Sequence, residues 1–246
     1  MLTFVRTWRR GEVPRPDLSV IGLAAIVGIA LHGVYLGSVF FAISIGLSAG
    51  ISALIVSMQP LFASVLAIFL FNERLRPVQS AGLLAGIAGV FIVLLPKMGG
   101  GMPPLGLFSV CCGLIAVTGG TLLQKRIGDK IDLLTGNLAQ TMAASGFLAV
   151  ICLTVETPQV SWEMPFLLAL AWQVIMVSAG AYVILMLLIK RDSMAAVSSL
   201  MFLVPPVTAV IAAAGFGEPL TLAGIIGFCL SSAGVYLVTA NSSPRE

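Results

Sequence analysis

Long apolar stretches separated by short polar connections run along nearly the whole chain. Each stretch holds about 20 residues, the length that an α-helix needs to cross a hydrocarbon core of about 30 Å. Backbone groups in lipid must be satisfied within the structure that spans it, and the stretches are too long and continuous for barrel strands. We therefore expect an all-α, polytopic transmembrane bundle with eight spans: 18–41, 50–71, 78–96, 105–124, 133–155, 166–189, 194–216 and 220–240.

The apolar pattern is duplicated within the chain. Residues 48–93 align without a gap on residues 193–238, at an offset of 145. Duplicated membrane helices are the sequence pattern of secondary transporters built from two structural halves. The matched pairs include Pro60 and Pro205, Glu73 and Glu218, Gly82 and Gly227, and Gly89 and Gly234.

Composition and charge indicate a membrane protein with a defined topology. Hydrophobic residues make up 59% of the chain and charged residues 9%, against roughly 25% charged in soluble domains. With a cytoplasmic N-terminus, every Lys and Arg except Lys97 falls on the cytoplasmic side, as the positive-inside rule requires. We expect a multi-pass protein of the plasma or inner membrane with both termini cytoplasmic. The net charge of +3 then reflects topology, and we expect no nucleic-acid partner.

The same topology makes the repeat an inverted one. It places Glu73 in a cytoplasmic loop and Glu218 in an external loop, so the two copies face opposite sides of the membrane. We divide the chain into a first repeat of three spans, residues 1–98, and a second repeat of five spans, residues 99–246. By this symmetry a complete relative has five spans in each half. The first repeat therefore has two spans fewer than the second, and whether this difference reflects biology or a misassigned start is left open.

The repeated residues resemble the EamA-type repeat of the drug/metabolite transporter superfamily. The first copy carries Phe71-Asn72-Glu73-Arg74-Leu75 and later Ala88-Gly89-Val90, and the second carries Gly217-Glu218-Pro219-Leu220 and later Ala233-Gly234-Val235. The resemblance implies ten helices in two inverted halves. It also implies a carrier for small metabolites, amino acids or drugs.

Three prolines lie well inside predicted spans, away from the span ends. Pro60 and Pro205 occupy matched positions, and Pro206 follows the second. A proline inside a helix removes a backbone hydrogen bond and bends the helix. Two interpretations stay open: a packing kink, or a symmetric pair of hinges beside a central cavity, where irregular backbone is tolerated.

The structural motif of the repeat consists of glutamates and glycines. Glu73 and Glu218 each stand just before a span, where a carboxylate can accept backbone N–H groups and interact with the helix dipole. No Asp or Glu lies well inside a span, which argues against a carboxylate proton relay. Close glycine spacing predicts helix–helix contacts in the bundle or in a possible homodimer. It is found at Gly82, Gly86 and Gly89 and at Gly224 and Gly227, with Gly234 in the second copy of the motif.

Polar side chains inside the spans are candidates for binding a substrate. His32, the single histidine, could be a hydrogen-bonded packing residue, a substrate ligand, or a group that titrates near neutral pH. Asn137, Gln140 and Thr141 are three and four residues apart, so they should share one helix face that points into the bundle. Gly33 and Tyr35 align with Gly180 and Tyr182 at an offset of 147. The candidate substrate-binding residues are His32, Tyr35, Gln59, Asn137, Gln140 and Tyr182.

The sequence favours a transporter over an enzyme. It contains no HExxH motif, serine nucleophile elbow or phosphate-binding glycine loop. The four cysteines lie inside spans without metal-ligand spacing, so we expect no metal and no cofactor. The expected partners are the lipid bilayer and a small-molecule substrate. We predict transport of small organic solutes by alternating access. The alternative is a truncated, inactive remnant or a membrane interaction protein that transports nothing.

Overall fold

The computed structural model describes residues 17–71, 76–97, 102–156, 159–180, 203–217 and 221–240. These ranges are helical and contain no strand, so the predicted all-α membrane fold is confirmed. Six helices are long and apolar enough to cross a membrane, and the described residues hold two shorter apolar helices, Met164–Ser178 and Val204–Gly215. The six are Leu18–Ser44, Ala49–Leu66, Pro77–Leu94, Pro104–Ile127, Leu134–Thr154 and Leu222–Thr239.

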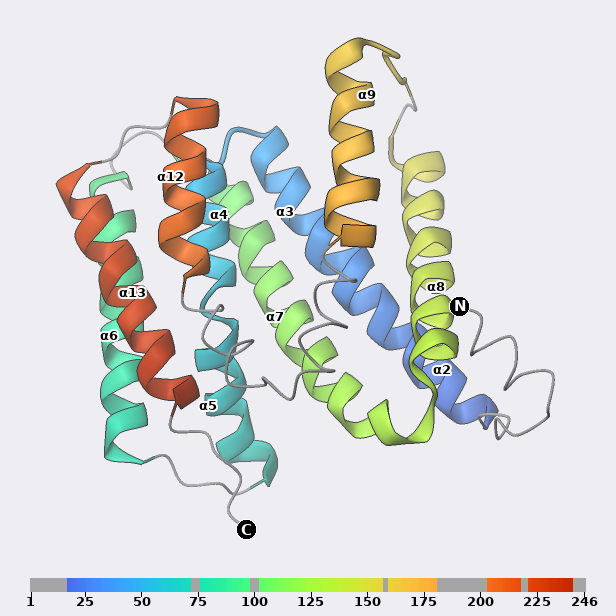
Figure 1. Ribbon diagram of the computed structural model, residues 1–246, viewed down its shortest axis with the longest axis horizontal. Helices are drawn as coiled ribbons and strands as arrows, with labels where there is room; N and C mark the ends of the chain where they lie inside the picture. Colours follow the sequence, from blue (N-terminus) through green and yellow to red (C-terminus); the bar gives the residue numbers. More distant parts are fainter. Residues whose placement is uncertain are drawn as a thin grey trace. The chain divides into compact units, whose positions relative to one another are not determined.

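Described helix lies within each of the eight predicted spans, but residues 181–189 of the sixth span and 194–202 of the seventh lie outside the described residues (Figure 1). Large apolar side chains cover the helix surfaces, as at Phe69 (76% exposed) and Ile115 (65% exposed), and this surface contacts the lipid bilayer. In chain order the elements are α2 (Leu18–Gly28), η1 (Ile29–Val34), α3 (Tyr35–Ser44), α4 (Ala49–Val56), α5 (Gln59–Phe71), α6 (Pro77–Leu94), η2 (Leu95–Lys97), α7 (Pro104–Ile127), η3 (Gly128–Lys130), α8 (Leu133–Thr154), α9 (Met164–Ala171), η4 (Trp172–Gly180), α12 (Val204–Phe216) and α13 (Leu222–Ala240).

Several helix ends follow from local sequence. Pro77 and Pro104 stand in the first turns of α6 and α7, where the missing N–H of proline costs no hydrogen bond. The side chain of Gln79 accepts the N–H of Arg76 at 2.9 Å and so caps α6. Gly217 ends α12 in the left-handed region (φ +65°), a conformation that glycine adopts without steric cost.

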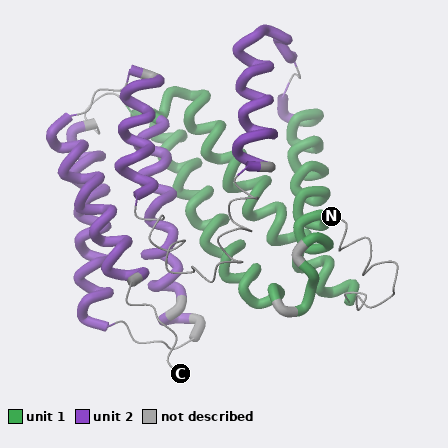
Figure 2. The backbone as a smooth tube through the Cα atoms, viewed as in Figure 1, with its two compact units in different colours: residues 1–48, 102–154 green, residues 49–101, 155–246 purple. Residues whose placement is uncertain are grey.

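The chain forms two compact units, each with helices from both sequence repeats (Figure 2). Unit 1 contains residues 1–48 and 102–154, and unit 2 contains residues 49–101 and 155–246. The boundaries of the compact units thus differ from the boundary between the two repeats, which the sequence analysis places between residues 98 and 99. That boundary stays a prediction from sequence.

In unit 1, α7 packs antiparallel to the first span through small residues. The hydroxyl of Ser109 donates to the carbonyl of Ser38 at 2.9 Å. Three glycines of α7 at intervals of seven residues lie against this span, and this spacing lets two backbones approach closely. Their neighbours run in reverse order along the chain: Gly106 meets Leu47, Gly113 meets Tyr35, and Gly120 meets Leu31.

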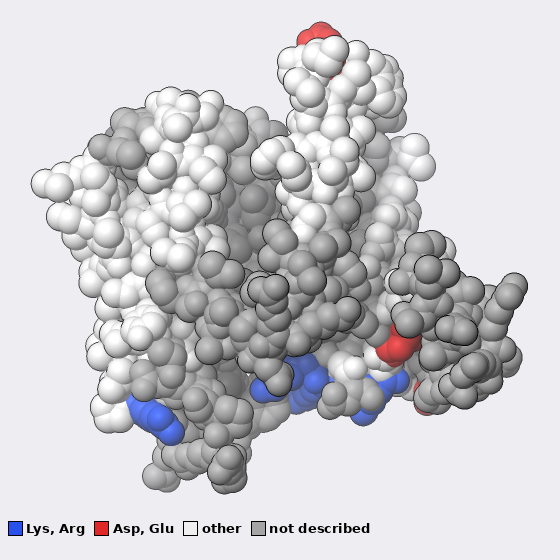
Figure 3. Space-filling model, viewed as in Figure 1, with Lys and Arg blue, Asp and Glu red and all other residues white. Residues whose placement is uncertain are grey.

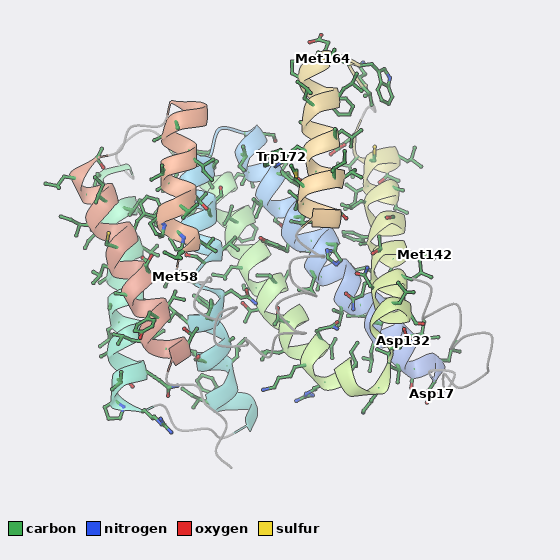
Figure 4. All side chains as sticks on the ribbon, viewed as in Figure 1. Asp17, Met58, Asp132, Met142, Met164 and Trp172 are labelled. Carbon is green, nitrogen blue, oxygen red and sulfur yellow. The ribbon has the colours of Figure 1, made fainter. Side chains whose placement is uncertain are left out.

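An apolar cluster closes one end of unit 1. Ala24 and Val27 of α2 pack with Ile127 and Ile131 from the corner between α7 and α8, and all four are buried. The start of α2 therefore lies at the same end of the unit as this corner. Figure 4 shows Asp17 and Asp132, the residues just before α2 and α8, at that end.

In unit 2, the main contact joins α6 and α13, the last span of each repeat. The two helices lie side by side and antiparallel (Figure 1). α12 packs against α4, and α5 packs against α13. The buried core of this unit includes Leu54, Leu61 and Val235, all 0% exposed.

Candidate substrate site

The first span changes from α to π geometry around His32. In η1 the N–H of Tyr35 donates to the carbonyl of Ala30, five residues earlier, which is the π pattern. His32 is half-buried and forms no hydrogen bond with any residue in the described part of the chain. An imidazole in a membrane span needs a polar partner or water. Its surroundings therefore fit a group that meets water or a polar solute.

A pair of glutamine side chains lies between α7 and α8 in the same unit. Gln140 is 6% exposed, and its Nε2 donates to Oε1 of Gln124 at 2.7 Å. The backbone of Gly28 in the first span lies directly against the backbone of Gln140. The sequence had placed Gln124 at the end of a span and did not single it out. The signal was its position near the α7–α8 corner, where the two helices are joined.

The three residues expected on one inward face of α8 differ in burial, and among them Gln140 is the buried one. Asn137 and Thr141 are exposed in the described structure. The hydroxyl of Thr141 donates to the carbonyl of Asn137 at 2.8 Å, within its own helix. A spacing of three and four residues places the three side chains on one side of a helix. It does not decide how much of that side a neighbouring helix covers.

Pro60 marks a break in its span, where the sequence predicted a bend inside a continuous helix. α4 ends at Val56, Ser57 and Met58 form a turn, and α5 begins at Gln59 (Figure 4 labels Met58). In a continuous helix the N–H of residue 60 would bond the carbonyl of Val56. Proline lacks this donor, and its ring clashes with that carbonyl. The hydroxyl of Ser57 instead donates to the carbonyl of Leu54 at 2.6 Å.

The second copy starts its helix at the equivalent residue. α12 begins at Val204 and ends at Phe216, and α5 begins and ends 145 positions earlier in the sequence. Pro205, fully buried, is the second residue of α12, as Pro60 is of α5. Pro206 is half-buried in the same first turn.

A π segment is also present in both copies. η4 includes Gly180, the residue that aligns with Gly33 of η1. π turns inside α-helices occur frequently at functional sites. Tyr182, the last predicted substrate-binding residue, lies outside the described residues.

The glycine motif forms a close contact within the chain, between α6 and α13. A Cβ on Gly234 would lie 2.5 Å from the carbonyl oxygen of Gly82, and one on Gly227 would lie 2.6 Å from that of Gly89. Between these contacts, the hydroxyl of Ser231 donates to the carbonyl of Gly86 at 3.3 Å. Each contact joins residues of the two copies, and the pairs run in opposite directions along the two helices.

Gly224, another glycine of the predicted spacing, stands apart from this contact. A Cβ on Gly224 would approach only the side chain of Thr221, so Gly224 does not belong to the α6–α13 contact. Glu73 and Glu218 lie outside the described residues. Because the α6–α13 glycines meet inside one chain, a homodimer through them stays a prediction only.

Charged side chains gather at the corner between α7 and α8 (Figure 3). Lys125, Arg126 and Lys130 are exposed there. Oδ1 of Asp132 accepts the N–H groups of Leu134 and Thr135, each at 3.0 Å. Burial alone would raise the pKa of Asp132, but the hydrogen bonds from Thr135 and Leu134 outweigh it and hold the pKa below its ordinary value.

The described residues contain no group of three or more His, Cys, Asp or Glu side chains that could hold a metal ion. The polar groups in the described spans of unit 1 include the imidazole of His32 and the hydrogen-bonded amides of Gln124 and Gln140. They are uncharged hydrogen-bonding groups, apart from protonation of the imidazole.

A model of the EamA-like transporter family matches residues 1–95 and 104–240. This chain belongs to the EamA-like transporter family. The EamA assignment fits the observed fold, because it describes a helical membrane protein whose sequence carries the repeat twice. It identifies the chain as a multi-pass membrane protein of the drug/metabolite transporter type.

Named relatives support the EamA assignment. The chain is 25% identical over 201 residues to the uncharacterized transporter YvbV of Bacillus subtilis, covering 81% of this chain and 66% of the relative. It is 29% identical over 212 residues to the uncharacterized inner membrane transporter YedA of Escherichia coli, covering 82% and 65%. A probable amino-acid metabolite efflux pump of E. coli is 28% identical over 116 residues, covering 47% and 38%. The chain spans about two thirds of the length of the first two relatives.

Proposed function

We propose that the protein carries small organic solutes across the cell membrane by alternating access. The observation that supports this most is the matched position of two helices. α5 begins after the turn at Ser57 and Met58, with Pro60 in its first turn, and α12 begins and ends at the equivalent residues of the second copy, with Pro205 in its first turn. Secondary transporters of inverted-repeat type bind their substrates near discontinuous helices at matched positions of the two repeats. In this proposal the two copies exchange roles as the carrier changes from one open side to the other.

The groups available in the spans favour a neutral or zwitterionic solute. His32, Tyr35 and Gln140 are proposed to contact it, with Gln59, Asn137 and Tyr182 as further candidates. No carboxylate lies well inside a span to attract a cation, and no Lys or Arg to attract an anion. One relative is named a probable amino-acid metabolite efflux pump, so amino acids are the first class to test.

The proposed location is the cell or inner membrane, with both termini in the cytoplasm. The basic corner of unit 1, with Lys125, Arg126 and Lys130, would then face the cytoplasm, as the positive-inside rule favours. The bilayer and the solute are the proposed partners of the chain.

Solute counterflow tests the proposal directly. The full chain is reconstituted in proteoliposomes loaded with one unlabelled amino acid, and the accumulation of labelled amino acid is measured from outside. Each of the twenty amino acids is tested in turn. We expect at least one to exchange faster than in protein-free liposomes. If none exchanges through monodisperse, folded protein, the amino-acid assignment is wrong, and a membrane interaction protein without transport becomes the better reading.

Variants link this exchange to the proposed site. His32→Ala removes no hydrogen bond between described residues, so the protein should fold normally. Loss of one hydrogen bond to the solute, worth about 1–1.5 kcal/mol, should weaken half-saturation by about tenfold. Thr154→Val is the matched control, because Thr154 is exposed and its hydroxyl donates only to Val150 of the same helix. Equal exchange by wild type and His32→Ala would remove His32 from the site.

A further inference from the structure

The break between α4 and α5 lies at the middle of a membrane span. In the span Ala49–Leu66, the turn residues Ser57 and Met58 are the ninth and tenth of 18 residues. Met58 and Leu61 are buried and lie against Gly86 of α6, so protein contacts hold the break in place. Irregular backbone at this depth is tolerated only where it is buried in protein or lines a water-filled cavity. The backbone groups at the break therefore need partners that lipid does not supply.

Two carbonyls at the end of α4 lose the donors that a continuous helix would give them. The carbonyl of Val56 would accept the N–H of residue 60, but Pro60 has none. The carbonyl of Ser57 would accept the N–H of Leu61, which instead donates to the carbonyl of Met58 at 3.0 Å. Among the residues that the structure describes, none donates to the carbonyl of Val56 or Ser57. Both oxygens therefore keep their capacity to accept a hydrogen bond.

The hydroxyl of Ser57 adds a third oxygen to these two. It donates its proton to the carbonyl of Leu54 at 2.6 Å, so its lone pairs remain to accept. The C-terminal end of a helix, where the carbonyls lie, also has a partial negative charge. Residues 49–71 contain no Lys, Arg or His that could neutralise it. An all-acceptor set at a negative helix end favours a positively charged ligand.

We propose that the carbonyls of Val56 and Ser57 and the hydroxyl of Ser57 form a subsite for a primary ammonium group of the transported solute. Such a group has three N–H donors, which equals the number of oxygens offered. Unwound carbonyls and the C-terminal ends of half-helices bind cations in transporters with broken helices. A sodium ion is the other source of the same charge. That the ammonium belongs to a transported solute rests on the function proposed above, whereas the cation subsite does not.

Pro60 is a positioning residue in this proposal, because it leaves the carbonyl of Val56 without a helical donor. The second copy retains the proline as Pro205, but its sequence has Phe202 where the first copy has Ser57. A phenyl ring offers no oxygen, so the second copy cannot complete the same set. Phe202 lies outside the described residues. We therefore expect one ammonium subsite per chain.

Thermal melting of the purified full chain tests the subsite without transport. The probes are methylammonium, tetramethylammonium and sodium chloride, compared at neutral pH and equal ionic strength. Methylammonium keeps three N–H donors, whereas tetramethylammonium has the charge without a donor. We expect methylammonium to raise the melting temperature more than the other two, because a ligand that binds the folded state stabilises it. An equal or larger effect of sodium or tetramethylammonium, or no effect of methylammonium, would overturn the subsite.

Variants of Ser57 test its hydroxyl. Each variant is compared with its own melting temperature in the absence of methylammonium, so that a change in folding is separated from a change in binding. Ser57→Ala should weaken methylammonium binding by at least about tenfold, the effect of one lost hydrogen bond to a charged group. Ser57→Thr keeps the hydroxyl and should bind normally. Ser64→Ala is the matched control, since the Ser64 hydroxyl donates to a carbonyl of the same span, that of Pro60, at 2.9 Å. Equal losses in Ser57→Ala and Ser64→Ala would remove Ser57 from the subsite.

Pro60→Ala separates the subsite from a hinge. Alanine provides an N–H that can occupy the carbonyl of Val56, so methylammonium should bind more weakly at equilibrium. A stiffer hinge alone would slow exchange and leave this affinity unchanged. Unchanged methylammonium affinity in Pro60→Ala would therefore exclude the positioning role of the proline.

Failure of the subsite and failure of the transport function give different results. If methylammonium binds as expected but no amino acid exchanges in counterflow, the subsite stands and the proposed function fails. If an amino acid exchanges but its N-trimethylated form competes equally well, transport stands and the ammonium subsite is wrong.

Discussion

The contact between α6 and α13 predicts an unusually large effect for a single methyl group. In a Gly234→Ala variant, the new Cβ would lie 2.5 Å from the carbonyl oxygen of Gly82 and 2.5 Å and 2.7 Å from N and Cα of Gly86. Ordinary contacts between carbon atoms are about 3.5–4.0 Å. All three opposing atoms belong to the backbone, so no side chain can rotate to make room. The two helices must separate by about 1 Å near this point, which weakens the dispersion attraction along the contact.

The expected cost follows from two opposing effects. Overpacking of this kind costs about 1–3 kcal/mol, and the rigid backbone places this site near the upper end. Replacing glycine by alanine inside a helix stabilises the folded state by up to about 1 kcal/mol, because alanine has the higher helix propensity. We therefore expect Gly234→Ala to lower the free energy of unfolding by about 2 kcal/mol. Gly146→Ala in α8, where a Cβ would meet nothing within 4 Å, should be neutral or slightly stabilising.

The assay is unfolding of the purified full chain in mixed micelles, with helix content followed as SDS is added. The Gly234→Ala midpoint should fall, while the Gly146→Ala midpoint should hold or rise. Gly89→Ala, at the equivalent residue of the other copy, should cost a similar amount. The double variant should cost less than the sum, because one separation of the helices relieves both clashes. A wild-type midpoint for Gly234→Ala, or full additivity, would refute the close-contact reasoning.

Other predictions concern topology, the helix breaks and pH. A reporter fused after Lys130 should read cytoplasmic and one near Gln159 external, and the reverse pattern would contradict the inverted repeat. Pro60→Ala and Pro205→Ala should insert normally yet slow exchange in the counterflow assay, since alanine restores the backbone N–H that proline lacks and stiffens the helix; unchanged exchange would remove their hinge role. Because the folded-state pKa of Asp132 is lowered, its carboxylate should stabilise the protein above about pH 4 and lose this effect as pH falls through the folded-state pKa. Thermal melting should show this pH dependence reduced in Asp132→Asn; an identical profile would exclude the contribution.

Helix positions were predictable from sequence because lipid imposes a strict rule on them. A span must hold about 20 apolar residues, so its approximate ends follow from where polar residues resume. The first span illustrates this, since 18–41 was predicted and Leu18–Ser44 is observed. The close contact of Gly82 with α13 was also signalled, because only small residues allow backbones to approach in a membrane.

Local departures from regular helix were not predictable in the same way. A π turn adds one residue to a turn without changing composition, so the apolar length of the span around His32 gives no sign of it. Pro60 signals a distortion of the helix, but proline is compatible with either a bend or a break. The turn at Ser57, which the sequence did not predict, makes it a break. Gln124 was missed because its partner, Gln140, is 16 residues away and becomes its neighbour only when the corner between α7 and α8 folds.

The contact of Ser231 with Gly86 also bears on how the protein is made. These residues are 145 positions apart, and at about 5–20 residues per second the ribosome needs about 7–30 s to add the chain between them. During that interval α6 is already in the bilayer while its partner helix does not yet exist. The glycine face of α6 then meets lipid, or the α13 of another nascent chain on the same membrane. A high density of nascent chains in the membrane should therefore favour pairing of α6 with the α13 of another chain. Slower translation of the last span should prolong the time during which α6 lacks its own partner.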